Sequence, residues 1–320
     1  MLSHGNLMDN VVCWDDMEND SIDICMNVLP IHHIFCISGD LFFVIRYGSI
    51  LTICPELAKM IDYIQLFKPT KIRAVPMMIK MLYNRVAIAM KKNPELSPVE
   101  AKNKVLGSNL KLLISGGGYL SSSLAEKLFE IGILTGQGYG MSECSPKISS
   151  PDYGNKEKLA SVGKIVRGCQ VRIVDDEIQV KSSSVMMGYY KDPERTKEAL
   201  TEDGWLCTGD LGYVDEDGFL FLTGRKKNLI ILSNGENVSP EMIENKFDGE
   251  VLISDILAYG DGSVIAAEVY PNYEYAQANK ILDIEEAVNE IVQKYNKELP
   301  TYARISKCAI RKNPFPKNSS

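Results

Sequence analysis

Several familiar signals are missing from this 320-residue sequence. Its eight cysteines are scattered singly, and none stands at CxxC spacing, so the sequence predicts neither a zinc site nor a redox pair. We see no signal peptide before them, which favours reduced, mostly buried thiols in a cytoplasmic protein. The most apolar stretch, LFFVIRYGSILTIC, is interrupted by Arg46 and is too short to span a bilayer. We therefore expect at most peripheral contact with a membrane.

An excess of basic residues is also missing. The chain has 42 acidic residues against 35 lysines and arginines, a net charge of -7, so we expect no nucleic-acid partner. Its composition, 45% hydrophobic and 24% charged, is that of a folded protein rather than a disordered one. The length suits two or three lobes.

The first part of the chain alternates between strand and helix patterns. IDICMNVLP, SILTIC, TKIRAVP and NLKLLISGGG read as strands. Between and after them, HHIFCISGDLFFVIRYG, PELAKMIDYIQLF, MMIKMLYNRVAIAMKK and SSSLAEKLFEIG read as helices. Such alternation predicts a largely parallel sheet covered by helices.

The pattern changes twice further along. VRIVDDEIQVKS and LGYVDEDGFLFLTG read as short strands joined by acidic and glycine turns. Later segments read as a strand, a helix near PEMIENKF, two strands and the helix IEEAVNEIVQKYNKEL. We therefore predict an α/β fold in three parts: a parallel-sheet lobe at 1–160, a small β-rich lobe at 161–225 and a mobile α+β lobe at 226–320.

Chemistry is first suggested by GQGYGMSEC, residues 136–144. Gly138 and Gly140 let a backbone approach a ligand closely, and Tyr139 between them offers a flat face for stacking on a base. Ser142 and Glu143 supply hard oxygens suited to Mg²⁺. Taken alone, the stretch is better explained as a glycine-rich turn with an exposed acid.

Two later stretches add polar groups. GWLCTGD ends in Asp210, whose carboxylate can accept hydrogen bonds from a ribose diol, although a turn aspartate would read the same way. GRKKNLIILSNGENVSPEMIE places Arg225 before a strand, a glycine turn and a proline-started helix.

Together these motifs resemble one superfamily. LPIHHIF, SGGGYL, GYGMSE, WLCTGD and GRKKNLIILSNGENVSPEMIE occur in the order typical of adenylate-forming (AMP-binding) enzymes. That superfamily includes acyl-CoA synthetases, firefly luciferase and the adenylation domains of peptide synthetases. GYGMSECSP and GRKKNLIILSNGENVSP look most like long-chain fatty acid–CoA ligases.

The resemblance implies roles for individual residues. The nucleotide would be held by Gly116, Gly117, Gly138, Tyr139, Gly140, Asp210 and Arg225, with adenine near Tyr139 and the ribose on Asp210. The catalytic residues would be Glu143 as the Mg²⁺ ligand, Ser142 near phosphate or metal, and His33 near the acyl carboxylate. Lys227 would be the hinge before the C-terminal lobe, and Gly235 would lie beside the pantetheine tunnel of coenzyme A.

Two further elements of the superfamily have no match in the sequence. A phosphate loop ending in PKG is expected shortly before LSHGNL, which here is residues 2–7. NPFPKNSS resembles the start of a P-K-T-x-x-G-K motif, with Lys317 as its first lysine and no second. We therefore expect a fragment, incomplete at both ends, that is inactive or weakly active alone because charge on the leaving pyrophosphate is poorly compensated.

The predicted function of the complete parent is ATP-dependent conversion of a fatty or other carboxylic acid to an acyl-adenylate, then transfer to coenzyme A. The alternatives are a non-catalytic nucleotide- or acyl-binding fragment, and transfer to a carrier protein. An amino-acid-activating enzyme is disfavoured, because such enzymes commonly carry an aspartate where this chain has HHIF. A luciferase-like oxidase shares the HHxF pattern, so the motif alone does not exclude that alternative.

Overall fold

The computed structural model describes residues 1–13, 23–233 and 235–316. The chain divides into two compact units, each with its own hydrophobic core. The first unit is Met1–Thr208 with Gly212–Leu222, and the second is Gly209–Leu211 with Thr223–Ser320.

A five-stranded parallel sheet forms the centre of the first unit, in the order β2-β1-β3-β4-β5. Its strands are β1 (Ile24–Asn27), β2 (Ile50–Ile53), β3 (Lys71–Ala74), β4 (Leu112–Ser115) and β5 (Leu134–Gln137). Parallel pairing requires a crossover between strands, and the helical segments of the sequence provide it. The predicted parallel α/β architecture is confirmed.

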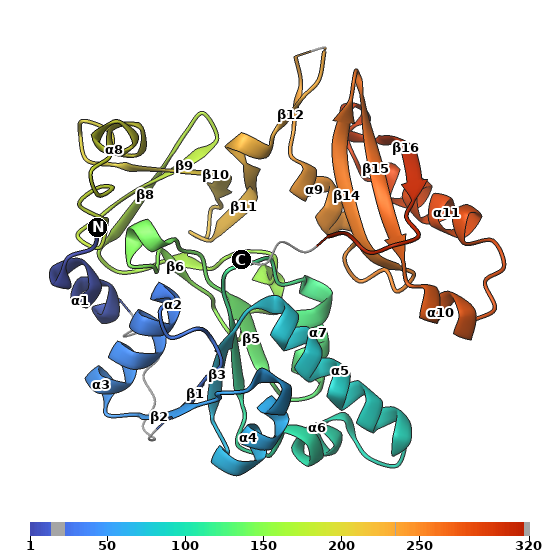
Figure 1. The fold of residues 1–320 in the computed structure, drawn as a ribbon, viewed down its shortest axis with the longest axis horizontal. Helices are drawn as coiled ribbons and strands as arrows, with labels where there is room; N and C mark the ends of the chain where they lie inside the picture. The colour runs from blue at the N-terminus through green and yellow to red at the C-terminus, as the bar shows by residue number, and fades with distance from the viewer. Residues whose placement is uncertain (14–22, 234, 317–320) are drawn as a thin grey trace. The chain divides into compact units, whose positions relative to one another are not determined.

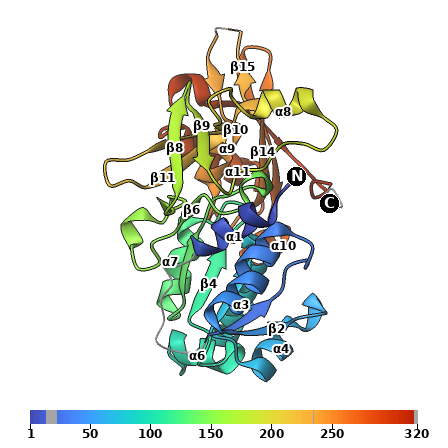
Figure 2. The same ribbon diagram turned by 90° about the vertical axis from the view of Figure 1, so that its left-hand side faces the viewer.

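Helices cover both faces of this sheet. They are α1 (His4–Val12), α2 (Ile34–Cys36), the π-helix η2 (Ile37–Phe42), α3 (Phe43–Tyr47), α4 (Met60–Phe67), α5 (Pro76–Lys92), α6 (Pro98–Leu106) and α7 (Ser122–Glu130). In Figure 1, α2 and α3 lie on one side of the sheet and α5 and α7 on the other. Figure 2 looks onto the first side, with α1 and α3 in front of the strands.

Successive side chains of a strand point to opposite faces of the sheet, so these apolar strands contribute to a hydrophobic core on each face. Met26 of β1 faces the larger core with Ile72 and Leu82, whereas its neighbour Cys25 packs against Phe43 and Val44 of α3. In the described ranges, no helix combines the length and the apolar character needed to cross a bilayer.

The helix predicted across HHIFCISGDLFFVIRYG forms, but not as a regular α-helix. It begins at Ile34, passes through the six-residue π segment and ends at Gly48, which takes φ 65°. Gly48 closes the helix because glycine adopts this left-handed conformation without a steric cost.

A short β-rich region follows the parallel sheet. It contains β6 (Ser149–Ser150) paired with β7 (Lys164–Ile165), and the sheet β11-β10-β9-β8. Those four strands are β8 (Cys169–Val174), β9 (Glu177–Ser182), β10 (Leu206–Val214) and β11 (Leu220–Arg225), with α8 (Pro193–Ala199) between β9 and β10. Asp175 and Asp176 both have positive φ in the β8–β9 hairpin, which matches the predicted acidic turn.

The second unit is α+β, as the sequence pattern predicts. It comprises β12 (Ile230–Ile231), β13 (Asn237–Val238), α9 (Pro240–Glu244), β14 (Ile253–Asp261), β15 (Val264–Pro271), α10 (Tyr273–Ala278), α11 (Ile284–Asn296) and β16 (Ile305–Ile310). β14 pairs antiparallel and β16 parallel with β15. The three-part boundaries and the mobility of the C-terminal lobe stay predictions.

Candidate active site

Two of the predicted glycine motifs lie side by side at the carboxyl ends of neighbouring strands. Gly116 follows β4 and donates its N–H to Ala74 O at 3.2 Å, while Gly138 follows β5 and donates to Ser115 O at 3.0 Å. Ligands of parallel α/β sheets bind outside these ends of the strands. The parallel register therefore brings SGGG and GQGYG to the same edge of the sheet.

The segment that carries His33 meets this edge through an aromatic ring. A Cβ atom added at Gly116 would lie 2.8 Å from Phe35 Cε1, closer than real Cβ contacts come. A side chain at position 116 would therefore displace the ring of Phe35, two residues after His33. The structure brings His33 and Gly116 into one region of the first unit.

His33 itself caps the start of α2. Its Nδ1 accepts a hydrogen bond from the Phe35 N–H at 3.1 Å, and its side chain is exposed. Since Nδ1 is the acceptor, Nε2 carries the proton of the neutral ring. Its predicted role beside the acyl carboxylate stays a prediction.

A buried ion pair anchors the helix that follows His33. Asp40 in η2 accepts from Arg73 Nη1 of β3 at 3.0 Å and from Asn27 Nδ2 of β1 at 3.1 Å. The Arg73 guanidinium also lies 4.7 Å from the centroid of the Phe43 ring. Burial raises the pKa of the Asp40 carboxyl, and the charge of Arg73 opposes that rise. Sequence reasoning missed this pair because its two residues are 33 positions apart.

The GYGMSE loop folds back against the segment that follows it. At Gly140, an added Cβ would come within 2.1 Å of Pro146 O, and the next residue, Met141, donates its N–H to that same oxygen at 3.0 Å. Gly138 has Ser149 O at 3.2 Å from its Cβ position. Close backbone packing therefore explains both glycines, in addition to the approach of a ligand that the sequence suggests.

Tyr139 lies in a core cluster rather than on the surface. Its side chain is 8% exposed and belongs to the cluster that contains Cys144, Ile148 and Val162. Its N–H donates to Ser149 Oγ at 3.2 Å. Stacking of adenine on Tyr139 stays a prediction.

Ser142 and Glu143 form a short 3₁₀ helix, η4 (Ser142–Cys144), directly after this loop. Ser142 is exposed and Glu143 is half-buried. A hydrogen bond joins the residue after η4 to the helix that follows His33, because Ser38 Oγ donates to the Ser145 carbonyl at 2.7 Å. The predicted catalytic residues of the first unit thus belong to connected elements.

A tyrosine that sequence reasoning missed holds Glu143. The Tyr189 hydroxyl donates to Glu143 Oε1 at 2.9 Å, across 46 positions of sequence. Burial raises the pKa of Tyr189, as does its hydrogen bond to the carboxylate, so the phenol stays a donor at neutral pH. No local spacing could have linked Tyr189 with Glu143.

The oxygens of η4 fit a magnesium ion that is carried by a nucleotide. Mg²⁺ is usually bound through one or two carboxylates, with phosphate oxygens and water completing its shell. Ser142 and Glu143 offer a hydroxyl and a carboxylate of that kind. Among the described residues, no group of three or more His, Cys, Asp and Glu side chains is placed to hold a metal.

The remaining site residues lie in the second unit. Asp210 is buried, and its Oδ1 lies 2.7 Å from Arg225 Nε, so the structure brings these two predicted ribose-binding residues together. Lys227 is exposed in the 3₁₀ helix η6 (Lys226–Asn228). Gly235 takes φ 86° with open space at its Cβ position. Lys317 lies outside the described residues.

Family models match most of the chain. Residues 1–190 match the model described as AMP-binding enzyme, and residues 227–319 match the AMP-binding enzyme C-terminal domain. The chain therefore belongs to the AMP-binding family of adenylate-forming enzymes, which confirms the resemblance seen in the sequence.

Individual relatives include ligases of two kinds. The chain is 34% identical over 242 residues to long-chain-fatty-acid–CoA ligase FadD15 of Mycobacterium bovis, covering 64% of this chain and 40% of that protein. It is 30% identical over 347 residues to 4-coumarate–CoA ligase CCL1 of Humulus lupulus, covering 100% of this chain and 59% of that protein. The chain thus spans less than two thirds of these relatives.

A solved structure agrees with the fold. O-succinylbenzoate coenzyme A synthetase (MenE) from Bacillus subtilis, in complex with ATP and magnesium ion, matches with a TM-score of 0.78 at 26% identity. The match covers 97% of this chain and 62% of that one. Apo MatB from Rhodopseudomonas palustris matches with a TM-score of 0.75 at 25% identity, over 100% of this chain and 62% of that one.

Proposed function

We propose that the protein activates a long-chain fatty acid with ATP and passes the acyl group to coenzyme A. The observation that carries the proposal is the position of Ser142 and Glu143. Their oxygens follow β5, and the SGGG turn follows the neighbouring β4, at the edge where parallel sheets bind ligands.

The chemistry sets out what these residues would do. The substrate carboxylate attacks the α-phosphorus of ATP, and pyrophosphate leaves with the electron pair of the broken P–O bond. A thiol then displaces AMP from the acyl carbon and loses its proton. Magnesium bound at Glu143 would neutralise charge that builds on the phosphates.

Other residues of the chain would bind and orient the substrates. Asp210 would accept hydrogen bonds from the ribose hydroxyls, with Arg225 holding the carboxylate in place. His33 would lie beside the acyl carboxylate. Rotation of the C-terminal lobe about Lys227 would let one active site serve both steps, as such hinges do elsewhere.

For these 320 residues alone we propose binding rather than turnover. The sequence has no match to the phosphate loop or to the second lysine of the P-K-T-x-x-G-K motif. We therefore expect no appreciable exchange of pyrophosphate into ATP. A non-catalytic nucleotide- or acyl-binding role is the alternative to the acyl-CoA ligase activity, and a carrier protein is the alternative acceptor to coenzyme A.

A second acid class is favoured by one observation. The 4-coumarate–CoA ligase of Humulus lupulus matches the whole chain, whereas the fatty-acid ligase matches 64% of it at higher identity. An aromatic acid is therefore the second candidate substrate.

Stable acyl-adenylate analogues test the proposal. Adenosine 5′-sulfamates that carry a palmitoyl, a coumaroyl or an aminoacyl group are titrated into the chain by calorimetry, with adenosine as the reference. We expect the palmitoyl analogue to bind at least tenfold more tightly than adenosine. A preference for the coumaroyl group would move the assignment to aromatic acids. Equal affinity for all four compounds would refute acyl-adenylate binding.

A further inference from the structure

We infer that Tyr189 is a positioning residue, which fixes the carboxylate of Glu143 in the orientation that binds magnesium. The inference rests on the proposed function, since it assigns a role toward the metal of that site. Tyr189 need not touch the nucleotide or the reacting atoms to act in this way.

The contact between the two side chains is direct. The Tyr189 hydroxyl lies 2.9 Å from Glu143 Oε1, and Glu143 is half-buried. A carboxylate with one oxygen held by a phenol keeps a second oxygen for a metal. Groups that hydrogen-bond a metal-binding carboxylate fix its orientation and its affinity for the ion.

Two further hydrogen bonds join the segments of Glu143 and Tyr189. Met186 N–H donates to the Glu143 carbonyl at 2.7 Å, and Ser145 Oγ donates to the Ser184 carbonyl at 2.8 Å. Residues 184–189 are therefore joined to residues 143–145 by these two bonds and by the phenol, which is the group that bonds the Glu143 carboxylate.

The tyrosine is itself held from two directions. Its N–H donates to Thr196 Oγ1 at 2.9 Å, and the guanidinium of Arg195 lies 4.9 Å from the centroid of its ring. Gly188 makes this possible, because a Cβ there would lie 2.8 Å from Thr196 Cγ2. The phenol is thus a preorganised donor rather than a mobile one.

The next residue provides a matched control. Tyr190 has the same side chain but is 70% exposed, and its ring lies 5.3 Å from Lys191 Nζ. Tyr189→Phe and Tyr190→Phe each remove one hydroxyl, and only the first removes a bond to Glu143.

The test measures metal affinity without requiring turnover. ATP is held at saturation on the chain, Mn²⁺ is titrated, and the bound ion is followed by electron paramagnetic resonance. Adenosine affinity, which involves no metal, is measured in parallel by calorimetry. We expect Tyr189→Phe to weaken Mn²⁺ binding about tenfold, in line with other changes next to metal ligands. Tyr190→Phe should match wild type, and adenosine should bind all three proteins equally.

Glu143→Gln separates the inference from the proposed function. If this variant binds Mn²⁺ as wild type does, Glu143 is not the ligand, and both the metal assignment and the inference are overturned. Wild type that binds no Mn²⁺ with ATP overturns both as well. If Glu143→Gln weakens binding and Tyr189→Phe does not, the inference alone is wrong. A loss of adenosine binding in Tyr189→Phe would show a general structural role and would also overturn it.

Discussion

The guanidinium of Arg73 and the carboxylate of Asp40 form an ion pair, with 3.0 Å between Nη1 and Oδ1, inside the first unit. Both side chains are almost fully shielded from solvent, and the pair joins β3 to the π segment that follows His33. Breaking such a pair leaves a buried charge without its partner. The pair therefore fixes the helix that carries His33 to the sheet.

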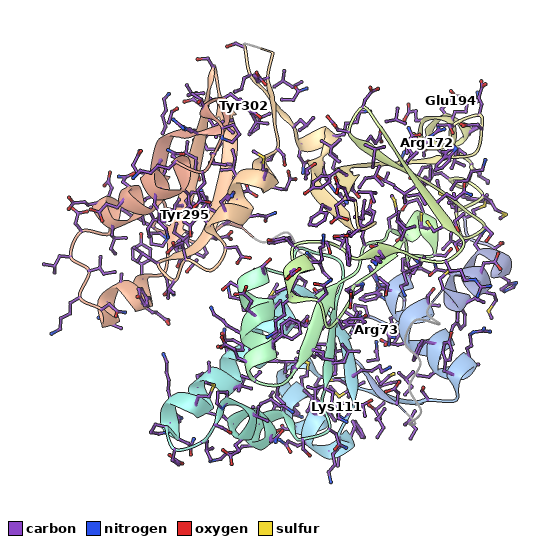
Figure 3. All side chains as sticks on the ribbon, turned by 180° about the vertical axis from the view of Figure 1, so that it is seen from behind. Arg73, Lys111, Arg172, Glu194, Tyr295 and Tyr302 are labelled. Atoms are coloured by element: carbon purple, nitrogen blue, oxygen red, sulfur yellow. The ribbon has the colours of Figure 1, made fainter. Side chains whose placement is uncertain are left out.

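We predict that Arg73→Met lowers the free energy of unfolding by about 3–5 kcal/mol. The double variant Asp40→Leu/Arg73→Met should be more stable than Arg73→Met, because no charge is left buried. Arg172→Met is the control, since the Arg172–Asp203 pair is partly exposed and should contribute less than about 1 kcal/mol. Figure 3 labels both arginines. Urea denaturation measures all three, and equal losses for Arg73→Met and Arg172→Met would contradict the account.

The strand segments of the parallel sheet were predictable along the chain because each is a short apolar run between helical patterns. β1, β3 and β4 lie within the stretches that the sequence assigned to strands. The helix α6 was missed although its signal is present, since Ser97 and Glu100 form the S-x-x-E capping box at its start.

The contacts of the site were less predictable. Glycines at 138 and 140 were predicted to let a ligand approach, which stays a prediction, and the structure shows in addition that backbone from 146–149 packs against them. Tyr189 and Arg73 meet their carboxylates across long separations. Such contacts depend on the packing of whole elements, which residue spacing does not encode.

Gly140→Ala should destabilise the first unit strongly. Its Cβ would meet the Pro146 carbonyl oxygen, and a backbone atom held by Met141 N–H cannot move aside as a side chain can. We expect a loss of about 3 kcal/mol, at the upper end for overpacked positions. Gly154→Ala is the control because nothing lies within 4 Å of its Cβ position. Urea denaturation measures the free energy of unfolding of both variants. Similar values for the two would contradict the predicted clash at Gly140.

Acid should weaken the second unit through Glu250. Its carboxylate accepts from Lys294 Nζ at 2.8 Å and from the Tyr295 hydroxyl at 2.8 Å, and these bonds, that of Lys294 foremost, lower the pKa of Glu250. Figure 3 labels Tyr295. The Glu250 carboxyl binds its proton less tightly in the folded state than in the unfolded state. Its contribution to stability is therefore complete above about pH 4.3, the ordinary pKa of glutamate. It is lost as the pH falls through the lowered pKa.

Melting temperatures at pH 7 and pH 3 test this contribution. Glu250→Gln should reduce the difference between the two melting temperatures relative to wild type. Glu290→Gln, which alters an exposed glutamate of α11, should leave that difference unchanged. An unchanged difference in Glu250→Gln would show that the bonds to Lys294 and Tyr295 do not stabilise the folded chain.

The central claim, that this chain binds the nucleotide of an adenylate-forming reaction, is tested most directly by titrating adenosine into wild type and Asp210→Ala. A carboxylate that accepts hydrogen bonds from ribose hydroxyls contributes roughly 1.5–3 kcal/mol, so Asp210→Ala should bind adenosine about ten- to a hundredfold more weakly. Asp261→Ala, which removes a carboxylate from an exposed pair with Lys307, should bind as wild type does, and melting curves check that each variant is folded. Adenosine affinity in folded Asp210→Ala equal to that of wild type would contradict the ribose assignment and leave Asp210 as a structural residue of β10.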